Sequence, residues 1–391
     1  MRSRQLVAER FKVDEPNQRD VLLSGTKLSG IHGLRFVAAM MVVVFHLRDV
    51  AQVAPPFAFD RSLSAGVMLF FILSAFSLMY STSTYKNEQN WMGIFAAKRF
   101  FRIAPLFYFI MFVDIQLGIT GPANAFDVTL SAMFVFNFFP NLQGSLVWAG
   151  WTVGVEMIFY AIMPVVIGVV RSLRSAIVFL ILSMLIGLST INSPSQFGLP
   201  MLFKYITFPC ELQFFAAGLG AYFAFREFLK ISSMRIAKLS TGLMVVVAAV
   251  GAWSLYETSY LSDLEYYFLS CLVLFIPLVI VQAWRPSWIF SNSFAKYWGE
   301  RSYSIYLTHG VVLISGRPVW AFLVFHFGTI IGFWLVASLA TALILIASWF
   351  TYRFIELPGM QFGSRLWSSM LMEKNHWIEA PTLVVGQDSS R

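Results

Sequence analysis

Long apolar runs separated by short polar segments fill most of the chain. Ten of these runs reach the roughly 17–25 residues that an α-helix needs to cross a bilayer. They lie approximately at residues 31–50, 64–80, 103–120, 152–170, 175–191, 205–225, 239–256, 266–283, 303–325 and 329–350. A further apolar stretch at 128–140 is short and ends in Phe-Phe-Pro, so we expect it to be re-entrant or interfacial. The pattern predicts an all-α fold, a polytopic membrane bundle of about ten transmembrane helices.

The distribution of Lys and Arg orients this predicted bundle. If the N-terminus is cytoplasmic, the segments on the cytoplasmic side hold 23 of the 28 basic residues. The outer loops then hold four, namely Arg48, Arg61, Lys204 and Arg317. Cytoplasmic loops of membrane proteins carry an excess of Lys and Arg. We therefore expect both termini to be cytoplasmic.

Polar segments flank the predicted membrane domain at both ends. Residues 1–30 are polar and basic, and the first apolar run begins only near Ile31, without a small-residue cleavage site after it. A cleavable signal peptide has a different order, so we interpret this segment as a retained cytosolic tail. The expected organisation is a polar tail at 1–30, a transmembrane domain at 31–358 and a second cytosolic tail at 359–391.

The composition excludes several classes of protein. Of the 391 residues, 58% are hydrophobic and 12% are charged, whereas a soluble domain has about 25% charged residues. Such a chain cannot cover a water-soluble surface, so a cytosolic globular enzyme is excluded. The net charge of +8 resides in short segments between apolar runs, which indicates membrane orientation and not binding to nucleic acid. Cys210 and Cys271 lie within apolar runs, and no group of residues has metal-ligand spacing, so we expect neither a disulfide nor a metal site.

Two ionisable residues, Arg35 and His46, interrupt the first apolar run. Charged groups inside a bilayer are costly and mark functional sites by default, with structural pairing as the alternative. Eleven residues of helix correspond to about 1100°, or three turns plus about 20°, and to a rise of about 16 Å. The two side chains therefore share one helix face at two depths, with Arg35 nearer the inner surface.

This Arg-x10-His spacing is one of six motifs that follow one another along the chain. The others are GVMLFFILSAF at 66–76, RFFRIAPL at 99–106, WTVGVEMIFY at 151–160, GERSYSIYLTH at 299–309 and YRFIELP at 352–358. Together the six resemble the motifs of the integral-membrane acyltransferase 3 family over approximately residues 30–358. The chain departs from the family at Met68, where Asp is common, so no role of that Asp is transferred to this chain.

The resemblance implies an activity and its substrates. Members of the family acetylate polysaccharides, lipopolysaccharides and other extracytoplasmic acceptors. We therefore expect a membrane-bound O-acyltransferase of a bacterial inner membrane that uses acyl-CoA, most simply acetyl-CoA, as its cytosolic donor. The acceptor is expected to be a hydroxyl of a carbohydrate or a lipid-linked glycan.

The arginines are the candidates for binding the donor. Arg99 and Arg102 are three residues apart and share a helix face where the third run leaves the cytosol. Two guanidinium groups suit the phosphates of acyl-CoA, although anchoring by the positive-inside rule is the alternative. Arg35, one layer deeper, could meet the pantetheine or pyrophosphate part of the donor, or neutralise a buried carboxylate.

Two histidines and a glutamate are the candidates for the chemical step. His46 could take a hydroxyl proton as a general base or accept the acyl group itself, and the sequence does not choose between these routes. Glu156 could orient His46 or form a structural ion pair. His309 could belong to the active site or be a hydrogen-bonded core residue. Together with Arg35, which could neutralise a buried carboxylate, these residues are the predicted catalytic residues: Arg35, His46, Glu156 and His309.

Several other residues receive secondary assignments. Ser302 and Tyr303 could line the same cavity as His309. Glu356 is expected to pair with Arg353 at the inner surface. Most of the tryptophans and tyrosines are explained by interfacial belts, and Trp148 and Trp151 could also stack on a sugar.

Two other kinds of function compete with the enzyme. A secondary transporter of a lipid-linked sugar would also need ions within the membrane, but it would not need CoA. A membrane scaffold without catalytic activity would tolerate loss of Arg99 and Arg102. The sequence leaves open the acceptor, the acyl chain, the oligomeric state and the side of the bilayer on which transfer occurs.

Overall fold

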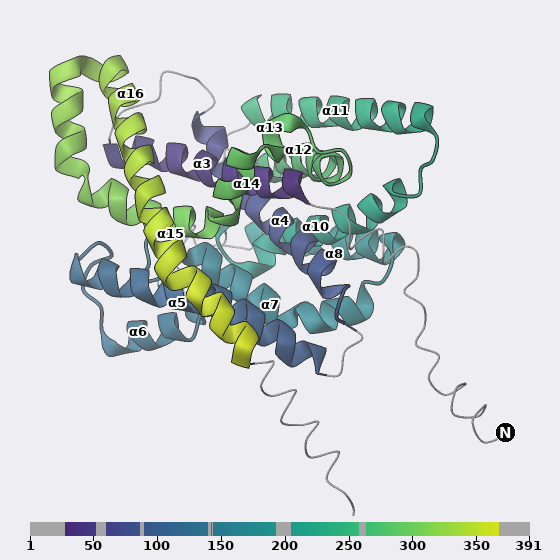
Figure 1. The fold of residues 1–391 in the computed structure, drawn as a ribbon, viewed down its shortest axis with the longest axis horizontal. Coiled ribbons are helices and arrows are strands. Elements are labelled where there is room, and N and C mark those ends of the chain that lie inside the picture. The colour runs from purple at the N-terminus through teal and green to yellow at the C-terminus, as the bar shows by residue number, and fades with distance from the viewer. Residues whose placement is uncertain are drawn as a thin grey trace, which may run out of the picture.

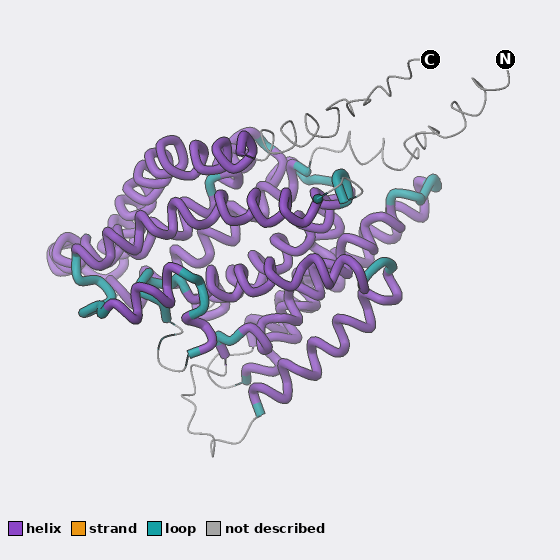
Figure 2. Tube along the Cα trace, turned by 90° about the horizontal axis from the view of Figure 1, so that it is seen from below, coloured by secondary structure: helices purple, strands orange, loops and turns teal. Residues whose placement is uncertain are grey.

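The computed structural model describes residues 28–51, 60–86, 90–139, 142, 144–192, 205–257 and 263–366. These residues form a bundle of helices with short connections and contain no strand (Figures 1 and 2). The helices are α3 (Ser29–Ala51), α4 (Gly66–Thr82), α5 (Trp91–Gln116), α6 (Ala125–Ala132), α7 (Trp151–Val169), α8 (Leu173–Ile191), α10 (Phe208–Phe228), α11 (Met234–Glu257), α12 (Leu264–Trp284), α13 (Trp288–Ser291), α14 (Ser293–Glu300), α15 (Ser302–Ser315) and α16 (Arg317–Thr351). The expected all-α class is therefore confirmed for these ranges. Most of the two predicted polar tails lies outside the described residues.

Seven stretches within the described ranges are long and apolar enough to cross a membrane. They are Ser29–Arg48, Ser62–Thr82, Trp151–Val169, Leu173–Ile191, Met234–Glu257, Leu264–Trp284 and Arg317–Leu366. The predicted runs at 103–120 and 205–225 also form long helices, α5 and α10, but they are not among these seven. The figure of ten crossings and the cytoplasmic position of the termini remain predictions.

The predicted span at 303–325 is divided in the structure between α15 and the start of α16. Pro318 has no backbone N–H and suits the first turn of a new helix. At the break, the indole of Trp320 packs against Gly316 and donates a 2.8 Å hydrogen bond to the carbonyl of Leu313. The 14 residues of α15 extend for only about 21 Å at the usual rise of about 1.5 Å per residue. This is less than the roughly 30 Å of a bilayer core, so α15 does not cross on its own.

The next helix, α16, reverses direction at Gly328, as Figure 1 shows. Gly328 has φ +73° and ψ 173°, a conformation that is accessible almost only to glycine. Gly332 then lies directly against the backbone of Val324, so the two arms of α16 pack on each other. The long apolar stretch Arg317–Leu366 is therefore a hairpin and not one continuous rod.

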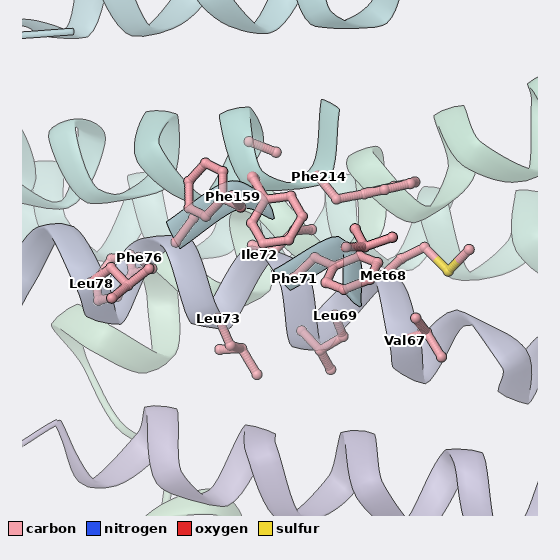
Figure 3. Close-up of a cluster of buried hydrophobic side chains, with 14 of the residues drawn as sticks. Val67, Met68, Leu69, Phe71, Ile72, Leu73, Phe76, Leu78, Phe159 and Phe214 are labelled. Atoms are coloured by element: carbon pink, nitrogen blue, oxygen red, sulfur yellow. The ribbon is translucent and has the colours of Figure 1, made fainter. Parts of the chain in front are cut away.

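Helices α4 and α10 form the centre of the bundle. α10 packs against α4, α8 and α12, and α4 also contacts α3 and α7. Figure 3 shows side chains of α4, among them Phe71 and Ile72, facing Phe159 of α7 and Phe214 of α10. Gly218 of α10 touches the backbone of Ile72, a close approach that a larger residue would prevent. This packing fixes the relative positions of α4 and α7, which both contribute to the site.

The apolar stretch at 128–140 forms the end of α6 and a short 3-10 turn, Phe136–Phe138. With eight residues, α6 is too short to cross a membrane. This agrees with the expectation that the stretch does not span. The chain after it returns toward the bundle through residues 144–150, which we call the tryptophan loop because it carries Trp148.

Candidate active site

A cavity lies between α3, α4, α5, α7 and α15. The Arg, Lys, Asp and Glu residues in its lining are three arginines from two helices, Arg35, Arg99 and Arg102, and one carboxylate, Glu156. Ser302 and Tyr303 line it as well. Four residues chosen from the sequence as site candidates, Arg35, Arg99, Arg102 and Glu156, therefore meet in one space, although they come from three different helices. We call this space the arginine cavity.

The arginine cavity carries an excess of positive charge. Arg99 and Arg102 project from one face of α5, and Arg35 comes from α3. The Nε atom of Arg99 is buried and has no hydrogen-bond partner among the described residues. Buried donors of this kind normally have partners. The cavity therefore presents unused donors and net positive charge, which suits an anionic group such as a phosphate.

Glu156 is held by two hydroxyl groups. The hydroxyls of Ser74 and Tyr160 both donate to Oε1 of the carboxylate. The hydroxyl oxygens of Ser74 and Tyr160 also lie 3.3 Å from each other. The expectation that Glu156 orients His46 is not met by this geometry, because the carboxylate hydrogen-bonds these two hydroxyls instead. Neither Ser74 nor Tyr160 was singled out in the sequence.

The two candidate histidines contact each other directly. Nε2 of His309 on α15 lies 3.1 Å from Nδ1 of His46 on α3. The ring centroids are 5.1 Å apart with an angle of 31° between the planes. Nδ1 of His309 contacts the backbone carbonyl oxygen of Tyr306, and the side chain of His309 is fully buried. We call His46 and His309 the histidine pair.

The tryptophan loop packs onto the histidine pair. The ring of Trp148 lies 4.6 Å from that of His46 and 5.4 Å from that of His309, measured between centroids. The backbone N–H of Trp148 donates a 2.9 Å hydrogen bond to Oδ2 of Asp114. Ser145 and Ala149 on either side have φ angles of +69° and +59°, which are rare for residues other than glycine and often occur at functional sites. Trp148 was considered as a sugar platform, and in the structure it contacts both histidines.

Tyr306 connects the arginine cavity to the histidine pair. Its side chain lines the cavity, where its hydroxyl accepts a hydrogen bond from Thr152 and donates one to the carbonyl of Ala149, both 2.9 Å long. Its own carbonyl contacts His309. His46 and His309 are not part of the cavity lining. The site therefore has two adjacent parts that share Tyr306.

Three buried carboxylates were missed or misassigned from the sequence. Glu356 was expected to pair with Arg353, but Arg353 is exposed, whereas Glu356 is buried and accepts a 2.7 Å hydrogen bond from Ser304. A short π-helical turn, Tyr352–Glu356, directs the two side chains differently. Asp114 and Glu211 were overlooked. Each is an ionisable residue in a predicted apolar run, the criterion that singled out Arg35 and His46.

The described residues contain no group of three or more His, Cys, Asp or Glu side chains that could hold a metal ion. Cys210 and Cys271 are both buried free thiols.

Comparison with known proteins identifies the family. Three proteins of Staphylococcus aureus, from strains COL, MSSA476 and MRSA252, are each 24% identical to this chain over 384 aligned residues. Their names assign them provisionally as O-acetyltransferases. The match covers 86% of this chain but only 58% of each relative, so the chain spans less than two thirds of their length. No solved structure matches the chain.

The model of one family, described as an acyltransferase domain, matches residues 28–353. This range contains α3 to α16, and with them the arginine cavity and the histidine pair. The agreement extends over most of the chain and over every helix that contributes to the site. The chain belongs to the acyltransferase 3 family, as its six motifs indicated.

Proposed function

We propose that this protein is a membrane-bound O-acyltransferase. It transfers an acyl group, most simply acetyl, from cytosolic acyl-CoA to a hydroxyl of an extracytoplasmic or lipid-linked carbohydrate. The observation that carries the proposal is the placement of three arginines in one cavity next to two histidines that contact each other. The family assignment supports acyl transfer in general, and the donor and the acceptor are parts of the proposal.

The arginine cavity is the proposed site of the donor. The phosphate groups of acyl-CoA would interact with Arg99 and Arg102, which lie on the same face of α5. Arg35 would meet the donor deeper in the cavity. A hydrogen bond to a charged group contributes about 1.5–3 kcal/mol, so the three guanidinium groups suffice for selective binding of a phosphorylated donor. Arginine also suits such a site because its charge persists when it is buried.

The histidine pair is the proposed site of proton transfer. The unperturbed pKa of histidine, about 6.5, makes the neutral ring a suitable base near neutral pH. His46 would remove the proton of the acceptor hydroxyl, or it would accept the acyl group before passing it on. Tyr306 lies between the two parts of the site. The thioester would therefore approach the histidines past Tyr306.

The proposed acceptor and location are supported by the family and by the aromatic surface around the histidines. Relatives named as O-acetyltransferases support a hydroxyl acceptor. Trp148, packed on His46, offers an aromatic surface for a sugar ring. Seven helices that could cross a membrane support a location in a bilayer, and we propose the bacterial inner membrane with both termini in the cytoplasm.

An assay in membranes tests this function with the natural acceptor in place. Inside-out vesicles from a host strain lacking the gene, complemented with a plasmid copy, would receive acetyl-CoA with a radiolabelled acetyl group. We expect alkali-labile label in the glycan or lipid-linked glycan fraction, and about 10²–10⁴-fold less of it with His46→Ala, the usual effect of losing a general base. The matched control is His326→Ala, because His326 is exposed on α16, away from the site.

Two further measurements, thermal stability of the purified protein and substrate counterflow in the vesicles, distinguish the enzyme from a carrier. Binding of acetyl-CoA should raise the thermal stability of the purified protein, because a ligand that binds only the folded state stabilises it. A transporter of lipid-linked sugar would show substrate counterflow without CoA. Absence of CoA-dependent stabilisation together with such counterflow would contradict the proposed activity.

A further inference from the structure

The hydrogen bonds of the histidine pair determine which nitrogen of each ring carries a proton. Nδ1 of His309 contacts the carbonyl oxygen of Tyr306, and a carbonyl oxygen only accepts hydrogen bonds. Nδ1 of His309 is therefore the donor, and the neutral ring has its lone pair on Nε2. That Nε2 lies 3.1 Å from Nδ1 of His46. In this bond Nδ1 of His46 must be the donor, which leaves the lone pair of His46 on Nε2.

We infer that His309 is a positioning residue that holds His46 in the tautomer protonated on Nδ1, so that Nε2 of His46 is the atom that takes the proton of the acceptor hydroxyl. This inference rests on the proposed acyl transfer and adds to it the identity of the reacting atom. It also assigns His309 a role that does not require it to touch either substrate.

The packing around the pair supports a fixed orientation. His309 is fully buried on α15, and Trp148 contacts both rings. The next residue, Gly310, lies so close to the indole of Trp148 that any side chain there would collide with it. His309, its neighbour and the tryptophan loop therefore hold one another in place. A base fixed in this way needs little rearrangement before it reacts.

The proton transfers of the reaction follow from this arrangement. The acceptor O–H bond breaks, its proton moves to Nε2 of His46, and the oxygen forms a bond to the thioester carbonyl carbon. The carbon–sulfur bond then breaks, and the departing thiolate of CoA takes the proton from Nε2. The products are the ester and CoA, and no other reactant is needed. During this cycle His46 carries a positive charge, and its Nδ1–H continues to donate to the lone pair of His309.

Two amide variants of His309 test the inference, because they differ by one methylene group. In His309→Asn the short amide reaches the carbonyl of Tyr306 but not His46. In His309→Gln the longer amide places its oxygen where Nε2 stood and accepts the hydrogen bond from Nδ1 of His46. Neither variant leaves a charged group in the pocket, and both should fold. Stabilisation by acetyl-CoA confirms that each retains an intact arginine cavity.

The measurement is the initial rate of label incorporation in the vesicles at increasing acetyl-CoA, normalised to the amount of protein. We expect His309→Asn to lower the maximal rate by about 10²-fold, within the range of a lost general base, with the apparent KM for acetyl-CoA unchanged. His309→Gln should recover most of that loss. A wild-type rate for the Asn variant, or equal losses in both variants, would overturn the inference while leaving acyl transfer established.

A double variant separates positioning from a structural role. If His309 acts only through His46, His309→Asn should cause no further loss in a His46→Ala background, because residues that act as a unit are not additive. A further loss of similar size would overturn the inference. Absence of any incorporation by the wild-type chain would instead overturn the proposed function, and the inference with it.

Discussion

Asp114 and Trp148 are joined by a 2.9 Å hydrogen bond from the backbone N–H of Trp148 to a carboxylate oxygen of α5. This bond ties the tryptophan loop to the helix that also carries Arg99 and Arg102. The other carboxylate oxygen, Oδ1, is buried and has no hydrogen-bond partner among the described residues. The histidine pair and the arginine cavity are thus linked through α5 as well as through Tyr306.

Replacing Asp114 should release the tryptophan loop. Asp114→Leu leaves the N–H of Trp148 without its acceptor, which should lower the free energy of unfolding by about 1–3 kcal/mol and reduce the rate of acyl transfer. Asp114→Asn retains an acceptor oxygen, so it should keep most of the stability and most of the rate of acyl transfer. Thermal unfolding and label incorporation in vesicles measure the two effects. Wild-type stability and rate for Asp114→Leu would show that the loop is held by other contacts.

Arg99 and Arg102 of the arginine cavity should determine the affinity for acetyl-CoA. Arg99→Ala and Arg102→Ala should each raise the apparent KM for acetyl-CoA by about tenfold or more, since each removes charge-assisted hydrogen bonds worth about 1.5–3 kcal/mol. The matched control is Lys98→Ala, because the adjacent Lys98 is exposed and interacts with the ring of Tyr85, 4.5 Å away. If Lys98→Ala raises the apparent KM for acetyl-CoA as much as the arginine variants do, the arginines contribute only general positive charge.

Replacing Glu211 by an apolar residue should stabilise the protein. It is fully buried in α10, and neither carboxylate oxygen has a hydrogen-bond partner among the described residues. A buried polar group without partners costs free energy, so Glu211→Met, which has a similar shape and no polar atoms, should raise the thermal midpoint. Because Glu211 does not line the arginine cavity, the rate of transfer should be unchanged. A lower midpoint would reveal that the carboxyl has a stabilising partner.

The centre of the bundle can be tested with two glycines of the same helix. A Cβ at Gly218 would collide with the backbone of Ile72 on α4, whereas a Cβ at Gly220 would meet open space. Gly218→Ala should therefore destabilise the protein, because α4 and α10 must move apart. Gly220→Ala should be neutral or stabilising by about 0.5–1 kcal/mol, the usual helix preference of alanine over glycine. Equal effects in the two variants would contradict the close approach of α4 and α10.

Much of the arginine cavity could be predicted because its residues follow one physical rule. Arg35 stands out as a charge in an apolar run, and Arg99 and Arg102 share a face by their spacing. The same rule applied to Asp114 and Glu211 would have found two further buried carboxylates. Helical periodicity identifies the face on which a residue lies, which is why Arg99 and Arg102 could be placed together.

Periodicity does not reveal which helix lies opposite a given face. His46 and His309 were both chosen as candidates, but their contact joins residues 263 positions apart and depends on how α3 packs against α15. For the same reason the sequence left open whether Glu156 orients His46 or forms an ion pair, whereas in the structure Ser74 of α4 and Tyr160, one turn along α7, provide its hydrogen bonds. The break between α15 and α16 had a local signal in Gly316 and Pro318. Because the run at 303–325 is mainly apolar, composition alone predicted one continuous span.

That break determines how the second histidine is held. α15 begins at Ser302 and ends at Ser315, so it is a separate short helix between α14 and α16. The hairpin that follows turns at Gly328 and exposes large apolar side chains, including Phe322, Phe325 and Ile330. α15 nevertheless packs along α16, and the hydroxyl of Thr308, next to His309, lies 3.0 Å from the hydroxyl of Ser348 on α16. The position of the second imidazole is therefore coupled to α16, although α15 and α16 are separate helices.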